Sequence, residues 1–137
     1  MIDEVTLKRV RKEREETIIH GQEAPMKFLS AWVSGVHVIG EGYFTHNERF
    51  ADKAPCLDKV TDKWQVIPNC GFIEENIGVL SGGEAKLLSV MCSFYNPEWG
   101  GKLMQDLGIK GMADISGNLD LNCKKIVAAL LLNYTGW

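Results

Sequence analysis

The chain has 137 residues, a length typical of one domain built around one hydrophobic core. Apolar residues make up 45% and charged residues 24%, a composition that excludes a disordered chain and a fibrous repeat. The formal net charge of -3 argues against a dedicated nucleic-acid binder, because such proteins concentrate Lys and Arg to neutralise phosphates. We therefore treat residues 1–137 as a single domain for which nucleic acid is an unfavoured partner.

Membrane insertion and a disulfide framework are not expected either. The longest apolar run, Ile126–Leu132, is much shorter than the ~20 residues that span a bilayer, and the charged N-terminus lacks the apolar segment of a secretory signal. The four cysteines are irregularly spaced and include no CxxC pair, although Cys56 and Cys70 lie beside turn residues that leave them open to reaction. These features predict a cytoplasmic protein.

The first predicted helix covers Asp3 to His20 and ends at Gly21, a residue that tolerates the left-handed cap conformation. Its basic residues are interleaved with acidic ones at four-residue spacing, as in Arg9 with Glu13 and Lys12 with Glu16. This pattern is typical of a solvent-exposed helix that packs on one side through a narrow apolar stripe. Nucleic-acid binding through this basic run is the alternative.

A second helix is predicted to begin near Ala24, because Pro25 suits a first helical position, where the missing N–H costs nothing. The apolar residues that follow recur at the spacing of a wide buried face, namely Phe28, Leu29, Trp32, Val33 and Val36. This segment is therefore expected to be a core helix.

The middle of the chain, residues 37–80, gives weaker signals. His37–Phe44 carries two glycines between pairs of strand-favouring residues, which indicates a small hairpin. Thr45 and Glu48 form a capping box that predicts a short helix over residues 46–53. Further on, KWQVIP is compatible with a strand and FIEENIGVL with a helical turn.

The stretch LSGGE at Leu80–Glu84 has the spelling of the signature loop of ABC-transporter ATPases. Such enzymes also need a GxxxxGK[ST] phosphate-binding loop, whereas the GK of this chain is followed by Leu103. Ser81 and Glu84 form instead a capping box, which predicts the start of a helix that runs to about Tyr95. Apolar residues lie on nearly every side of that helix, so we expect it to be central.

Two further helices are predicted in the last third of the chain. Asn96 and Pro97 suit the start of a helix that runs to about Leu107 and closes at Gly108. After a glycine-punctuated link to residue 117, the last helix starts near Asp120 and ends at Gly136. Ala128 and Leu132 leave the side opposite its main stripe apolar, so this helix is either deeply buried or shared with a second subunit.

The predicted fold is therefore mainly α, a compact bundle of about five helices with a small β-hairpin near residues 37–45; an α+β fold is the alternative. No nucleophile elbow, zinc motif or phosphate loop is present, so we expect no catalytic residue, metal or cofactor. The closest arrangement to a metal site is His37 and His46 across the hairpin with Glu48. The residues best placed for a binding cleft are Tyr43, His46, Glu48 and Trp99, with Tyr43 and Trp99 expected at the surface beside glycines.

Three stretches in Ser81–Trp137, SGGEAKLL, FYNPEWGG and LDLNCKKIVAALLLNYTGW, resemble small hypothetical proteins carried by plasmids, phages and integron cassettes. The resemblance implies an accessory protein of a mobile genetic element and carries no site residue over. Together with the apolar last helix, it favours a non-enzymatic module that binds a protein partner or a second copy of itself. A small enzyme or ligand-binding protein with the cleft named above is the alternative.

Overall fold

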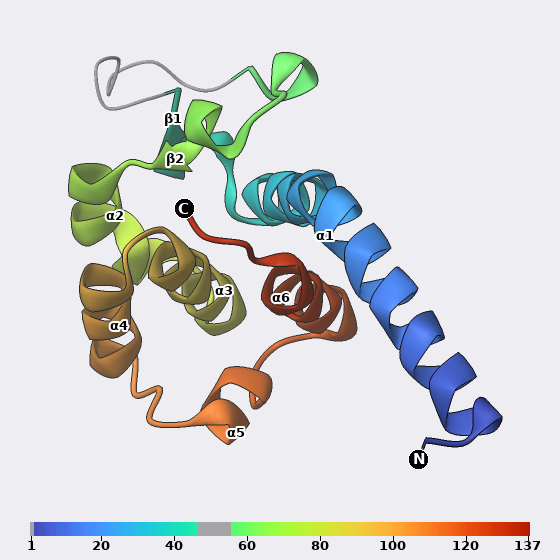
Figure 1. The fold of residues 1–137 in the computed structure, drawn as a ribbon. Helices are drawn as coiled ribbons and strands as arrows, with labels where there is room; N and C mark the ends of the chain where they lie inside the picture. The colour runs from blue at the N-terminus through green and yellow to red at the C-terminus, as the bar shows by residue number, and fades with distance from the viewer. Residues whose placement is uncertain (1, 47–55) are drawn as a thin grey trace.

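A computed structural model describes residues 2–46 and 56–137 (Figure 1). The fold is mainly α with a small two-stranded antiparallel sheet, which confirms the predicted class. Its helices in chain order are α1 (Glu4–Ile39), α2 (Cys70–Asn76), α3 (Gly82–Tyr95), α4 (Pro97–Asp106), α5 (Met112–Ser116) and α6 (Leu121–Asn133). Short 3-10 turns cover Glu41–Tyr43, Leu57–Lys59, Lys63–Gln65 and Ile77–Val79.

The first two predicted helices are one continuous helix, so the expected break between Gly21 and Ala24 is wrong. Pro25 lacks the N–H that would bind the carbonyl of Gly21, four residues earlier, and its ring crowds that same carbonyl. Both residues are exposed, so water can satisfy that carbonyl. The loss of one hydrogen bond does not end a helix whose following turns are held by the core.

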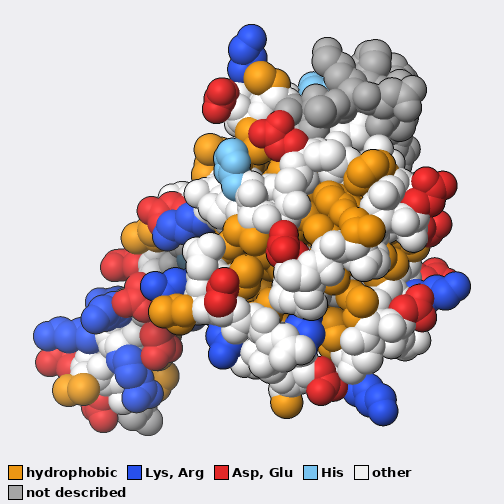
Figure 2. All heavy atoms as spheres, turned by 180° about the vertical axis from the view of Figure 1, so that it is seen from behind, with side chains coloured by type: hydrophobic (Ala, Val, Ile, Leu, Met, Phe, Trp, Pro, Cys, Tyr) orange, Lys and Arg blue, Asp and Glu red, His pale blue; other side chains and the backbone are white. Residues whose placement is uncertain are grey.

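The N-terminal part of α1, residues 4–23, extends away from the body of the molecule (Figures 1 and 2). We call it the arm. The first buried residue of α1 is Ala24, so the expected packing of this segment on one side is wrong as well. Asp3 caps the arm by accepting the Thr6 N–H at 2.8 Å, and Arg9–Glu13 and Lys12–Glu16 form exposed ion pairs at 3.9 and 4.0 Å. Exposed ion pairs of this kind stabilise a helix by a few tenths of a kcal/mol each, as predicted for a solvated face.

The small sheet joins two distant segments rather than forming a local hairpin. Strand β1 (Phe44–Thr45) pairs antiparallel with β2 (Ile67–Pro68), with Phe44 opposite Pro68. His37 to Ile39 belong to α1, whose C-cap is Gly40 with φ +121°. The hairpin expected within residues 37–44 is therefore wrong, because this segment contains the end of a helix and only the first residue of a strand. The helix predicted from the Thr45–Glu48 capping box falls mostly on residues 47–55, outside the described residues.

Helix α3 begins where the capping box predicts. The Glu84 N–H donates to Ser81 Oγ at 3.2 Å, and the Ser81 hydroxyl in turn donates to Glu84 Oε1 at 2.6 Å. Residues 85–92 are all buried, which confirms that this helix is central. Within the described structure, the LSGGE stretch is thus the N-terminus of a core helix.

Helix α4 packs on α3 at very close range. Asn96 caps it, Pro97 occupies its first turn and Gly108, with φ +80°, follows its end, all as predicted. Gly100 faces the backbone of Ser93 and Cys92, and a methyl group added to it would overlap the Ser93 nitrogen. The absence of a side chain at this position is therefore what allows the two helices to approach.

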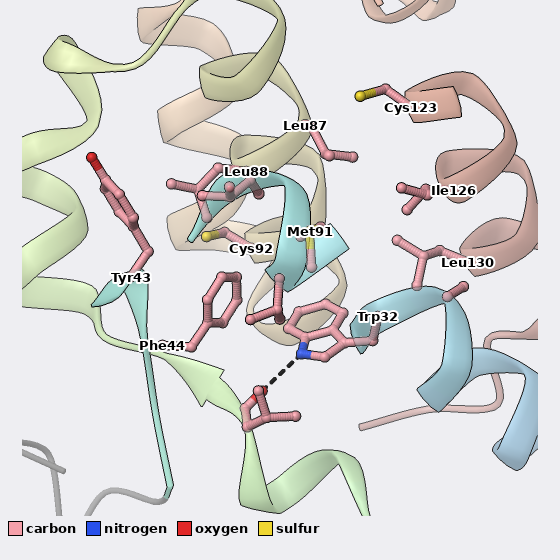
Figure 3. Close-up of a cluster of buried hydrophobic side chains, with 14 of the residues drawn as sticks. Trp32, Tyr43, Phe44, Leu87, Leu88, Met91, Cys92, Cys123, Ile126 and Leu130 are labelled. Carbon is pink, nitrogen blue, oxygen red and sulfur yellow. Dashed lines mark hydrogen bonds between the residues drawn. The ribbon is translucent and has the colours of Figure 1, made fainter. Parts of the chain in front are cut away.

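Trp32 lies on α1 at the centre of the core, where this helix packs against α3, α6 and the small sheet (Figure 3). It is fully buried, and its indole N–H donates to the Val66 carbonyl at 2.7 Å. Its ring packs against Phe28, Phe44 and Trp137 with centroid separations of 5.9, 6.0 and 4.6 Å. This cluster ties α1 to the segment before β2 and to the residues that follow α6.

The last third of the chain wraps α6 against α1. The glycine-punctuated link contains one short helix, α5, that its sequence did not predict. Asp120 caps α6 by accepting the Cys123 N–H at 2.8 Å, as expected. Cys123, Ile126 and Leu130 are buried on the inner side of α6, and its outer side is exposed.

Candidate functional site

Trp99 lies on α4 and borders a groove between α4 and α2. Its indole N–H donates to Glu74 Oε1 at 2.8 Å, and its ring is half-buried. The groove has a volume of about 330 Å³ and is lined by Glu74, Ile77, Trp99, Lys102, Leu103, Asp106 and Leu107. An apolar floor with charged side chains at its edge is a common composition for a small-ligand site.

Tyr43 is a core residue, so the expectation that it lies at the surface is wrong. It is 9% exposed, its ring packs edge-on against Phe72 at 5.0 Å, and its hydroxyl donates to the Asn76 carbonyl at 3.1 Å. In Figure 3 that hydroxyl points outward from the cluster toward α2. The tyrosine is held there because its ring fills the core while its polar tip satisfies a helix-end carbonyl.

Of the other two predicted site residues, His46 is not among the residues that line the Trp99 groove. His46 follows β1 and is half-buried, and Glu48 lies outside the described residues. Tyr43 and Trp99 both bind α2, yet only Trp99 lines the groove. Glu74 is the partner that sequence reasoning missed, because its distance of 25 positions from Trp99 leaves no local signal.

Residues 2–46 and 56–137 contain no group of three His, Cys, Asp or Glu side chains that could hold a metal ion. His37, which the sequence pattern placed opposite His46 across a hairpin, lies in the last turn of α1. Burial raises the pKa of the Cys92 thiol, and burial together with the Asp120 carboxylate raises that of Cys123 to about 11. Both thiols therefore stay protonated near neutral pH, which disfavours a role as nucleophile.

A second groove runs between α1 and α6, close to the base of the arm. Its volume is about 400 Å³, and it is lined by Lys27, Ser30, Ala31, Ser34, Asn122, Lys125, Ile126, Ala129 and Asn133. We call it the α1/α6 groove. Small side chains on both helices keep its floor shallow, which is the shape that accepts another helix. The same small residues at helical spacing, Ser30, Ala31 and Ser34, are the sequence signal that was overlooked.

Asn133 gives the α1/α6 groove a polar feature. It is 4% exposed, and its side-chain amide donates to the Ala129 carbonyl at 2.8 Å. Its buried Oδ1 has no hydrogen-bond partner among the described residues. An unpaired buried acceptor costs about 1–3 kcal/mol, so a donor brought in by a bound chain would lower the free energy of this site.

The outer side of α6 presents an apolar stripe next to this groove. Leu121, Ala128 and Leu132 are spaced so that they share one face of the helix, and Leu131 lies beside them. Leu121, Leu131 and Leu132 are 68%, 61% and 69% exposed. We call the stripe and the α1/α6 groove together the α6 face. Its outward apolar side chains agree with the sequence pattern that suggested sharing with a second subunit.

Comparisons of the chain with protein-family models, with curated proteins and with solved structures give no match. None of the described helices combines the length and the apolar character needed to cross a membrane. The assignment of a function therefore depends on the geometry of the α6 face and of the Trp99 groove.

Proposed function

We propose that the protein is a non-enzymatic accessory module of a mobile genetic element that acts by binding another protein chain, with a second copy of itself as the first partner. The observation that supports this most is the α6 face, where leucines with 61–69% exposure border a groove of about 400 Å³. Apolar side chains gathered at a groove are a common mark of a protein-binding surface. The resemblance of residues 81–137 to mobile-element proteins suggests the accessory role.

Self-association through the α6 face predicts a mass above 15.3 kDa by light scattering over a concentration series. The variant Leu132→Glu places a charge on the stripe and is expected to weaken association by about tenfold, because a charge buried at an interface without a partner is costly. Val79→Glu, at a position outside α6 that is 82% exposed, is the control and should leave the mass unchanged. Equal behaviour of the two variants would contradict the role of the stripe.

Ligand binding at the Trp99 groove is a second candidate, favoured by the hydrogen bond between Trp99 and Glu74 at its edge. A thermal-shift screen against metabolites, nucleotides and metal ions tests it. A ligand at 100 times its dissociation constant adds about 2.7 kcal/mol to the stability. A true hit should be lost in Trp99→Phe, which removes the indole N–H, and kept in Trp64→Phe, which alters a tryptophan outside the groove. A shift that survives Trp99→Phe would place the ligand elsewhere.

A further inference from the structure

The arm is a long helical segment that does not pack against the core. None of its side chains between Glu4 and Glu23 is fully buried, and Gly21 lowers its intrinsic helix propensity. Most of the stability of helices in proteins comes from packing one face against another element, and short isolated helices are marginal in water. Figure 2 shows Lys and Arg mixed with Asp and Glu along the arm. The apolar side chains of Val5, Ile18 and Ile19 on the arm are 79%, 60% and 51% exposed. A covering partner would supply the missing packing.

The face of α1 that forms one wall of the α1/α6 groove continues into the arm. Lys27, Ser30 and Ser34 line the groove. Counting back in steps of three or four residues from Ser30 gives Met26, Glu23, Ile19 and Glu16, which therefore share that face. Met26 and Ile19 are 63% and 51% exposed, large values for apolar side chains on a helix. The same side of α1 therefore forms a wall of the α1/α6 groove in its second half and is exposed to solvent along the arm.

The charges of the groove and of the arm face are opposite. Among the described residues that line the groove, the charged ones are Lys27 and Lys125, and no carboxylate joins them. The arm face offers Glu16 and Glu23, which within one chain form exposed ion pairs with Lys12 at 4.0 Å and with Lys27 at 2.8 Å. Charge complementarity of this kind selects a partner and its orientation.

We propose that the occupant of the α1/α6 groove is the arm of a second copy, exchanged reciprocally so that two α1 helices run antiparallel. In this antiparallel pair the two α1 helices meet at the helical turn formed by residues 23–26. This register places Ile19 of one copy beside Ser30 of the other. Glu16 then lies beside Ser34 and reaches Lys125 across the groove. The polar side chains of His20 and Gln22, at the C-terminal end of the arm, then lie near Asn133 of the other copy. The Oδ1 of Asn133 is unpaired and needs a hydrogen-bond donor. The inference rests on the proposed self-association and names its surface.

The length of the arm allows an extended contact between two copies. A helix of about 20 residues is about 30 Å long, and a two-fold dimer uses the arm twice. Stable interfaces bury about 1,200–2,000 Å², and reciprocal exchange doubles the contact that one arm makes. The same arrangement covers Ile19 and Met26, which are left to solvent in one isolated chain.

A charge exchange between Glu16 and Lys125 tests the proposal in the full-length protein by light scattering and analytical ultracentrifugation. Glu16→Lys and Lys125→Glu should each raise the dimer dissociation constant about tenfold or more, because two like-charge contacts replace two ion pairs. The double variant should recover the dimer. Glu15→Lys makes the same charge change on a different face of the arm and should dimerise like the unmodified chain. All three positions are exposed, and the ion pair with Lys12 that Glu16→Lys removes is worth only a few tenths of a kcal/mol, so circular dichroism should show nearly the same helix content in every variant.

The outcomes separate this inference from the proposed function. If Leu132→Glu weakens the dimer while Glu16→Lys behaves like Glu15→Lys, the α6 face binds a second copy and the arm does not, so the inference is overturned. If each single variant weakens the dimer and the double variant fails to restore it, the Glu16–Lys125 pairing is overturned. A chain that stays at 15.3 kDa at high micromolar concentration overturns both the inference and the homodimer.

Discussion

Gly100→Ala is expected to lower the free energy of unfolding by about 3 kcal/mol, near the upper end for overpacking a protein interior. The added methyl group would lie within 3.0 Å of the Ser93 nitrogen, the Ser93 Cα and the Cys92 carbonyl carbon. These are backbone atoms inside α3, so they cannot rotate away as a flexible side chain can. The overlap can be relieved only by separating α4 from the central helix, which uncovers the apolar side chain of Leu103.

Gly101→Ala is the matched control, because a methyl group added there meets nothing within 4 Å. Alanine has a higher helix propensity than glycine, so this variant should be more stable than the unmodified chain by up to about 1 kcal/mol. Urea unfolding followed by circular dichroism at one fixed protein concentration measures both, since self-association would make the midpoint depend on concentration. Equal stability of the two variants would show that α4 does not pack on α3 at Gly100.

Trp32→Phe is expected to cost a comparable amount, about 3 kcal/mol, for two reasons. The smaller ring leaves a cavity among Phe28, Phe44 and Trp137. It also removes the donor to the Val66 carbonyl, and Val66 is fully buried, so that oxygen loses its hydrogen bond without gaining water. The substitution therefore combines a packing loss with an unsatisfied acceptor.

Trp64→Phe makes the same chemical change at a position that is 50% exposed, and should alter the stability by about 0.5 kcal/mol at most. Circular dichroism is the suitable probe, because both substitutions change the tryptophan fluorescence itself. A Trp32→Phe variant as stable as Trp64→Phe would mean that the hydrogen bond and the ring contacts of Trp32 contribute little, contrary to its central place in the core.

The candidate sites show where inference from sequence ends. Trp99 was singled out from its glycine neighbours and does border a groove, but Glu74, its hydrogen-bond partner, could not be found from the chain alone. Tyr43 was predicted to be exposed for the same reason, its neighbouring glycine. It is instead buried against Phe72 and Asn76. Neighbouring glycines report local backbone freedom, whereas burial depends on which distant element covers the side chain. The α1/α6 groove was missed because it exists only where two helices meet.

The sequence by itself determined the starts of α3, α4 and α6, because a capping side chain such as Ser81 or Asp120 bonds to an N–H three residues away. It also determined the buried face of α1 beyond Ala24, since apolar spacing marks a helix side whatever it packs against.

Only the tertiary structure decided that α1 continues through Gly21 and Pro25, that residues 44–45 pair with residues 67–68, and that the arm stands free. The arm stands free because none of its residues is buried by another segment. The strand pairing, and the packing of α1 beyond Ala24 that lets the helix continue past Pro25, depend on contacts between segments far apart in the chain. Their free energies outweigh the few tenths of a kcal/mol to about 1 kcal/mol by which local preferences differ.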